Sequence, residues 1–131
     1  MSLAEAADGM GIAELARLAA RAADGKLGRD TVVIEVGDVL AITDYFVITS
    51  GANDRQVKSI VDEVEAQLSA IGVRPRRIEG LDDRKWVLLD FGSFVVHVFL
   101  DETRQFYELE RLWRDVPRLH WEPVEGARAG R

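Results

Sequence analysis

Paired carboxylates that hold two metal ions would give this chain the chemistry of a nucleotidyltransferase, and Asp82-Asp83 is the pair to test. Two such carboxylates on one strand must lie two positions apart, because strand side chains alternate between faces. Asp82 and Asp83 are adjacent and fall in an expected loop, and no expected strand carries an Asp-x-Asp or Asp-x-Glu spacing. Ser50-Gly51 also reverses the Gly-Ser order of the phosphate-binding turn in these enzymes. The sequence therefore disfavours nucleotidyl transfer.

The two histidines do not form a recognisable catalytic or metal-binding pattern. His97 lies in the middle of an expected strand, where a partly buried, hydrogen-bonded histidine is the favoured interpretation, and His120 lies in the C-terminal tail. Two histidines placed in this way do not make a metal site. The chain also has no phosphate loop, no glycine-rich dinucleotide fingerprint and no serine in a nucleophile elbow. We therefore expect a protein that is not an enzyme and needs no metal or cofactor.

The formal net charge of −6 argues against a protein that binds nucleic acid chiefly through phosphates, which would need a basic face. The one basic cluster is Arg74-Pro75-Arg76-Arg77. It could make a minor contact with nucleic-acid phosphates, but the favoured interpretation is an edge strand that its charges protect from aggregation. If the target is a ribonucleoprotein, an acidic chain should prefer its basic protein components.

Three absences in the sequence indicate where the protein works. It contains no cysteine, which excludes disulfides, thiol nucleophiles and cysteine-bound metals. It has no run of about 20 apolar residues, as a transmembrane helix requires, and no basic-then-apolar secretory signal at its N-terminus. We therefore expect a cytoplasmic protein that does not enter a membrane.

Apolar periodicity predicts an α/β fold with one mixed sheet of about five strands flanked by helices. The expected strands cover residues 31–36, 45–49, 73–79, 86–91 and 94–100, and the expected helices cover residues 11–23, about 54–71 and a last segment that precedes Pro117. Asn53 or Asp54 can cap the second helix, and Asp101 can cap the last one. Gly92-Ser93 is the two-residue turn of a hairpin between the last two strands.

One domain is expected over residues 11–114, between a flexible N-terminus over residues 1–10 and a loose C-terminal tail over residues 115–131. Within the last helix, four apolar residues are expected to form one stripe: Phe106, Leu109, Leu112 and Trp113.

Strand alternation gives the segment that begins at Trp86 two different faces, with Trp86, Leu88 and Asp90 on one and Val87, Leu89 and Phe91 on the other. Tryptophan is among the residues that most often anchor interfaces, and an aspartate is costly to bury without a partner. Either this strand offers a docking surface, or Trp86 and Phe91 are core residues and Asp90 receives the hairpin amides. The spacing leaves both interpretations open.

Several short motifs between residues 11 and 114 point to a known family. They are Ile42-Thr43-Asp44-Tyr45-Phe46-Val47-Ile48, Asp54-Arg55-Gln56-Val57, Glu79-Gly80, Trp86-Val87-Leu88-Leu89-Asp90-Phe91-Gly92, Val96-His97-Val98-Phe99, Arg104-Gln105-Phe106-Tyr107 and Leu109-Glu110-Arg111-Leu112-Trp113. In this order and at these separations, they resemble the ribosomal silencing factor family, also called Iojap-like.

The resemblance implies a bacterial or organellar protein that binds the large ribosomal subunit through ribosomal protein fourteen (uL14). Occupying that surface blocks joining of the small subunit and represses translation when nutrients are short. The family fold is similar to a nucleotidyltransferase core without its catalytic carboxylates, and its members commonly form homodimers. A large-subunit assembly factor would use the same surface, and a nucleotidyltransferase-like nucleotide-binding enzyme is the alternative from another class.

By the same resemblance, the docking surface comprises the tryptophan-containing strand and its hairpin. The implied ribosomal-protein-binding residues are Trp86, Asp90, Phe91 and Gly92, together with Thr43, Asp44 and His97. Trp86 and Phe91 are expected to fill an apolar depression on the partner while Asp90 meets a basic group. Many relatives have an aspartate after the hairpin glycine, where this chain has Ser93, so one negative charge is missing from the expected contact.

Overall fold

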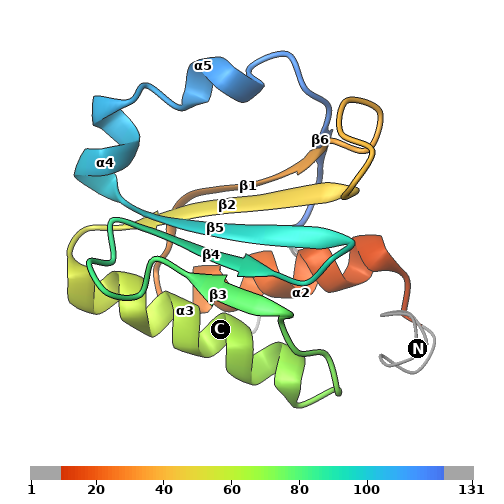
Figure 1. Cartoon of the computed structure of the whole chain (residues 1–131), viewed down its shortest axis with the longest axis horizontal. Helices are drawn as coiled ribbons and strands as arrows, with labels where there is room; N and C mark the ends of the chain where they lie inside the picture. The colour runs from red at the N-terminus through yellow and green to blue at the C-terminus, as the bar shows by residue number, and fades with distance from the viewer. Residues whose placement is uncertain (1–9, 123–131) are drawn as a thin grey trace.

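Residues 10–122 are described by the computed structural model of this chain, and they contain one six-stranded mixed sheet (Figure 1). The strands are β1 (Arg29–Glu35), β2 (Tyr45–Gly51), β3 (Arg77–Glu79), β4 (Trp86–Asp90), β5 (Phe94–Leu100) and β6 (Arg118–Leu119), and their order in the sheet is β3-β4-β5-β2-β1-β6. β2 and β5 pair in parallel, whereas the other neighbours pair antiparallel. The expectation of a mixed sheet flanked by helices is confirmed, with β3 as an edge strand and β2 in the interior.

Helices α2 (Ile12–Gly25) and α3 (Asp54–Ser69) cover one face of the sheet (Figure 1). α3 begins where the sequence predicted, because the Asn53 side chain accepts a hydrogen bond from the backbone N–H of Gln56 at 2.8 Å. The apolar sides of both helices and the strand residues that face them form the main core. Its fully buried members include Leu15, Ile60, Val64, Val47, Leu89 and Val96.

The segment expected to be one last helix forms two short helices, α4 (Asp101–Phe106) and α5 (Glu110–Trp113), on the other face of the sheet (Figure 1). The break comes at Glu108, whose φ of +49° is left-handed and cannot continue a right-handed helix. The prediction that these four residues form one apolar stripe is therefore wrong. Leu109 and Trp113 pack into a second, smaller core, while Phe106 and Leu112 are 77% and 72% exposed.

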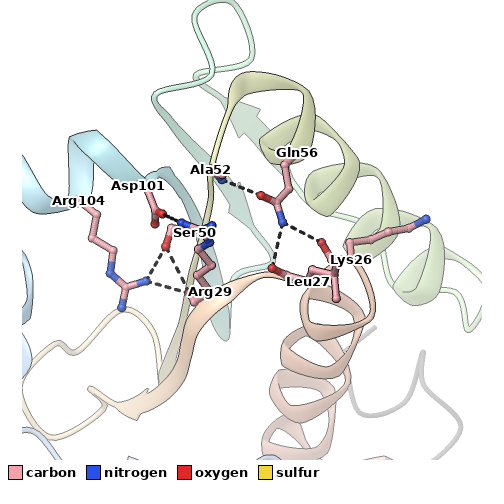
Figure 2. Close-up of polar contacts among 8 residues, drawn as sticks. All are labelled: Lys26, Leu27, Arg29, Ser50, Ala52, Gln56, Asp101 and Arg104. Atoms are coloured by element: carbon pink, nitrogen blue, oxygen red, sulfur yellow. Dashed lines mark hydrogen bonds and ion pairs between the residues drawn. The ribbon is translucent and has the colours of Figure 1, made fainter.

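The start of α4 also differs from the expectation, because Asp101 does not cap the helix with its side chain. Its carboxylate instead forms an ion pair with Arg29 at the beginning of β1 (Figure 2). Beside this pair, the guanidinium of Arg104 is buried and donates to the carbonyl oxygen of Asp30 at 2.9 Å and to the hydroxyl of Ser50 at 3.2 Å. These contacts attach α4 to the ends of β1 and β2.

A second polar clamp fixes the turn between α2 and β1 (Figure 2). The side-chain amide of Gln56 donates to the carbonyl oxygens of Lys26 and Leu27 at 3.1 and 3.0 Å, and its oxygen accepts from the N–H of Ala52 at 2.7 Å. Carbonyls at the end of a helix have no partner within the helix, so Gln56 satisfies groups that α2 and its turn leave open. The motif residues Gln56 and Arg104 thus position elements of the fold.

The tail expected to be loose is ordered in part, which corrects the boundary at residue 114. Arg118–Leu119 forms β6 against β1, with Leu119 opposite Val33. Trp121 is 8% exposed, packs into the main core and donates its indole N–H to the carbonyl oxygen of Thr31 at 3.0 Å. Residues 1–9 and 123–131, on which most of the expected flexible termini fall, lie outside the described residues.

Candidate docking face and its hollow

The side chains of β4 and β5 that point away from α2 and α3 form the candidate docking face. The strand register places Trp86 opposite Phe99, Leu88 opposite His97 and Asp90 opposite Val95. Directly opposite residues share a face of the sheet, so these six side chains lie together. The predicted alternation is confirmed, because the intervening residues Val87, Leu89 and Phe91 are buried in the main core.

Trp86 lies on this face with 46% of its surface exposed. Its ring packs against Phe99 with a centroid separation of 4.9 Å, and its indole N–H donates to Nδ1 of His97 at 3.1 Å. The backbone beneath it is closely packed. Gly80 has a φ of +90°, and a Cβ there would lie 2.0 Å from the carbonyl oxygen of Trp86, so only glycine fits. Trp86 is therefore an exposed ring that is held in a defined orientation.

His97 is 8% exposed, and its burial lowers its pKa from 6.5 to about 4. The side chain is therefore neutral at pH 7. Because an indole N–H can only donate, Nδ1 of His97 must be the acceptor in the contact with Trp86, and its proton must reside on Nε2. The prediction that His97 is buried and hydrogen-bonded is confirmed, and the hydrogen bond is made by Nδ1. Nε2, by contrast, is a buried donor without a partner among the described residues.

A hollow of about 240 Å³ lies on this face between the loop over residues 37–44 and strands β4 and β5. We call it the Thr43–His97 hollow; its lining is Leu40, Ile42, Thr43, Phe46, Arg76, Arg77, Leu88, Asp90, Gly92, Val95 and His97. Thr43 is 7% exposed, and its hydroxyl, like Nε2 of His97, has no hydrogen-bond partner within residues 10–122. The hollow thus has apolar walls, and two of its lining residues each carry a fully buried polar atom without a partner.

Asp90 is buried, and its carboxylate has local partners. It accepts from the backbone N–H of Gly92 at 2.8 Å and forms ion pairs with Arg76 at 3.2 Å and with Arg77 at 3.3 Å. The interpretation in which Asp90 receives a hairpin amide is therefore confirmed. The two arginines keep 69% and 64% of their side chains exposed, so their guanidinium groups form part of the rim of the hollow.

Phe91 does not lie on the docking face, and the prediction that it joins Trp86 as an outward anchor is wrong. It is 2% exposed and stacks on Phe94 with a centroid separation of 4.7 Å. The physical reason is strand alternation, which turns Phe91 toward the face that α2 and α3 cover. Its burial in the main core leaves Trp86 without the second ring that the resemblance implied.

The other predicted residues meet around the hollow. Thr43, Asp90, Gly92 and His97 all line it. Asp44 is exposed, and its backbone N–H donates to the carbonyl oxygen of Ser93 at 2.9 Å, which ties the 37–44 loop to the hairpin. Gly92 has a φ of +88°, a left-handed conformation that favours glycine in this turn.

Two exposed aromatic residues near Trp86 were not among the predicted site residues. Phe106 and Tyr107 are 77% and 61% exposed, and their rings meet edge to face at 4.9 Å. Together with Trp86 they line a cleft of about 590 Å³, and we call these three residues the aromatic patch. The motif Arg104-Gln105-Phe106-Tyr107 could have indicated these two residues. They were missed because the sequence predicted one continuous helix, in which Phe106 would face the core.

The described residues contain no group of three or more His, Cys, Asp or Glu side chains that could hold a metal ion. Within residues 10–122, no helix is long and apolar enough to cross a membrane.

Comparisons with known proteins agree with the family that the motifs indicated. A family model described as "Ribosomal silencing factor during starvation" matches residues 10–131. The ribosomal silencing factor RsfS of Bacillus subtilis is 39% identical over 101 residues, which cover 77% of this chain and 86% of that protein. The mouse protein named mitochondrial assembly of ribosomal large subunit protein 1 is 42% identical over 88 residues, or 65% of this chain and 39% of that protein.

Solved structures support the same assignment. A crystal structure of a protein from Chromobacterium violaceum matches with a TM-score of 0.76 and 29% sequence identity, and the match covers 88% of this chain and 97% of that one. A second, from Bacillus halodurans, has a TM-score of 0.71 at 34% identity and covers 82% of this chain and 97% of that one. The sequence motifs, the family model and the fold agree, and this chain belongs to the ribosomal silencing factor family.

Proposed function

We propose that this protein silences translation by binding ribosomal protein fourteen on the large ribosomal subunit and blocking association with the small subunit. The observation that carries the proposal is the aromatic patch, in which Trp86, Phe106 and Tyr107 are exposed beside one cleft. Exposed aromatic residues that surround a concave surface are typical of interaction sites. The docked protein would occupy the space that the small subunit needs, so inhibition requires no covalent step.

Trp86 is the central anchor in this proposal. Its hydrogen bond to His97 and its packing on Phe99 restrict the ring before binding, which lowers the entropy lost on association. Phe106 and Tyr107 take the place that we had expected Phe91 to fill. All three rings would contact the apolar part of the partner surface.

The charges of the chain suit a basic partner. Its net charge is −6, and the cleft beside the patch is lined by the acids Asp83 and Glu102 as well as by Lys85. Complementary charge mainly accelerates encounter and orients the complex. Asp90 acts indirectly in this proposal, because its carboxylate already has two arginine partners and orients them at the rim.

Three further parts of the proposal rest on the family and on surface chemistry. The protein would act in the cytoplasm without catalysis, and it would form a homodimer in the absence of ribosomes. The exposed guanidinium groups of Arg76 and Arg77 would make a minor contact with ribosomal RNA. Light scattering across a concentration series tests the dimer, and a constant monomer mass would refute it.

Co-sedimentation with purified large subunits tests the docking surface. Trp86→Ala should weaken binding by roughly 30- to 1000-fold, since truncating a central aromatic anchor costs about 2–4 kcal/mol. Leu27→Ala is the matched control, because Leu27 is 78% exposed, apolar and outside the aromatic patch. A folded Trp86→Ala variant that binds as tightly as the parent would remove the proposed surface.

Reassociation of separated subunits tests silencing itself. The parent protein should lower the yield of joined ribosomes in proportion to its occupancy of large subunits, and Trp86→Ala should not. The name of the mouse relative favours a second candidate function, assembly of the large subunit. A cell that lacks the protein should accumulate large-subunit precursors under the second candidate and should retain mature subunits under the first.

A further inference from the structure

An open groove of about 580 Å³ lies between the turn that joins α2 to β1 and the first turn of α3. Its charged lining residues are the cations Lys26, Arg29 and Arg55, and no acidic side chain among residues 10–122 lines it. We call it the basic groove. The chain as a whole has a net charge of −6, so this concentration of positive charge is a local feature that the overall balance hides.

Two of the three cations in the basic groove carry charge that no other group neutralises. Lys26 and Arg55 are exposed, and neither side chain has an ion-pair or hydrogen-bond partner within residues 10–122. Arg29, by contrast, pairs with Asp101 and adds little net charge (Figure 2). The groove therefore offers one free ammonium and one free guanidinium group, which are the donors that bind phosphate most strongly.

The basic cluster that the sequence indicated, Arg74-Pro75-Arg76-Arg77, has less free charge. Arg76 and Arg77 both pair with Asp90, and Arg77 also pairs with Glu79. A carboxylate beside a guanidinium repels an approaching phosphate and so reduces the attraction. Among the described residues, the basic groove is therefore better suited to an anionic partner than this cluster is.

The basic groove lies at the same end of the sheet as the aromatic patch. β2 and β5 run in parallel, and β1 and β4 pair antiparallel with them, so β1 and β4 begin where β2 and β5 end (Figure 1). This register brings Arg29 and Trp86 to one end of the sheet. At the same end, Asp54 at the start of α3 forms an ion pair of 3.8 Å with Arg84 in the loop before β4. A large partner docked at this end reaches both surfaces.

We propose that the basic groove binds the phosphate backbone of ribosomal RNA beside the protein that the aromatic patch contacts. The choice of partner rests on the proposed function, because a ribosomal subunit presents RNA phosphates next to basic protein surfaces. Lys26 and Arg55 each donate to a phosphate oxygen, and the release of counterions from the RNA favours binding. These contacts do not depend on RNA sequence, and they fix the orientation of the docked protein.

A titration of a fluorescently labelled RNA duplex of about 12 base pairs with the protein alone tests the basic groove without the ribosome. At about 50 mM salt the Kd should be about 0.1 mM, and two phosphate contacts predict that log K falls with log salt with a slope of about −2. The double variant Lys26→Gln/Arg55→Gln should weaken binding at least about 10-fold and bring this slope near zero.

The double variant Arg114→Gln/Arg118→Gln is the matched control. It removes the same charge, and both arginines are exposed and lie outside the basic groove. Its Kd should stay within about 3-fold of the parent value, because salt screens charges that lie beyond a Debye length of about 10 Å. In ¹H–¹⁵N spectra, the duplex should shift the backbone amides of residues 26–29 and 53–56.

Co-sedimentation with large subunits at increasing salt tests the same contacts on the ribosome. Lys26→Gln/Arg55→Gln should reduce the salt slope of binding by about 2, whereas Trp86→Ala should lower the affinity and leave the slope unchanged. A parent protein that does not bind large subunits would refute the proposed function, and the RNA titration would still decide whether the groove binds phosphates.

The inference fails if the parent shows no saturable binding to the duplex up to about 0.5 mM protein, five times the expected Kd. It also fails if the parent and Lys26→Gln/Arg55→Gln have equal salt slopes, or if the duplex shifts only the amides of residues 74–77. Both substituted side chains are exposed and unpaired, so the double variant should fold, and dispersed spectra establish that it does.

Discussion

Acidification should destabilise this protein through His97. Burial lowers the pKa of His97 from 6.5 to about 4 in the folded chain, so between these values the unfolded chain binds the proton more strongly. The stability that neutral His97 confers is therefore complete above pH 6.5 and is lost as the pH falls toward 4. Protonation would also place a hydrogen on Nδ1, where the indole of Trp86 now donates.

The size of the effect follows from the two pKa values. Each unit of pKa difference corresponds to about 1.4 kcal/mol, so full protonation would cost about 3 kcal/mol. Between pH 7 and pH 5, the free energy of unfolding should fall by about 2 kcal/mol through His97 alone. That is a large part of the total of about 5–15 kcal/mol that an ordinary domain has.

Urea unfolding of the parent and of His97→Asn at pH 7, 6 and 5 measures this contribution. Asparagine does not titrate but keeps an acceptor for Trp86, so the difference in pH slope isolates His97 from Asp90 and the other carboxylates. The parent should lose about 2 kcal/mol more than the variant between pH 7 and pH 5. Equal slopes would refute the assignment of a neutral, desolvated His97.

Three other substitutions test how the fold is held together. Arg104→Met should lower the free energy of unfolding by about 2–4 kcal/mol, because it leaves the carbonyl of Asp30 and the hydroxyl of Ser50 without their donor. Glu110→Gln should cost less than about 1 kcal/mol, since the side chain of Glu110 is 55% exposed, and similar losses for the two would contradict this view. Trp121→Ala should cost about 3–5 kcal/mol in the same assay, and a loss below about 1 kcal/mol would show that the segment after residue 114 is dispensable.

Local sequence patterns predicted the parts of the fold that repeat over many residues. The period of apolar residues identified both long helices, Asn53 identified the start of α3, and alternation along β4 separated Trp86 from Val87. These patterns are reliable because apolar residues recur on the core-facing side at every turn of a helix and at every second residue of a strand.

Other features had no repeating signal. β6 has two residues, too few for a period, and the break at Glu108 depends on a single backbone conformation. The pairing of Trp86 with Phe91 failed for a different reason. The alternation rule had placed Phe91 on the face opposite Trp86 without deciding which face was covered, and the family resemblance was carried onto Phe91 as a surface residue.

Residue order and local periodicity were enough to predict the family, the α/β class and which residues of β4 share a face. That Thr43, Arg76 and His97 surround one hollow, and that Phe106 and Tyr107 line one cleft with Trp86, became evident from the folded chain. These residues come from separate elements, and their meeting depends on strand order, on the 37–44 loop and on the break after α4. Contacts between distant segments follow from how the whole sheet packs, and no local pattern in the chain specifies them.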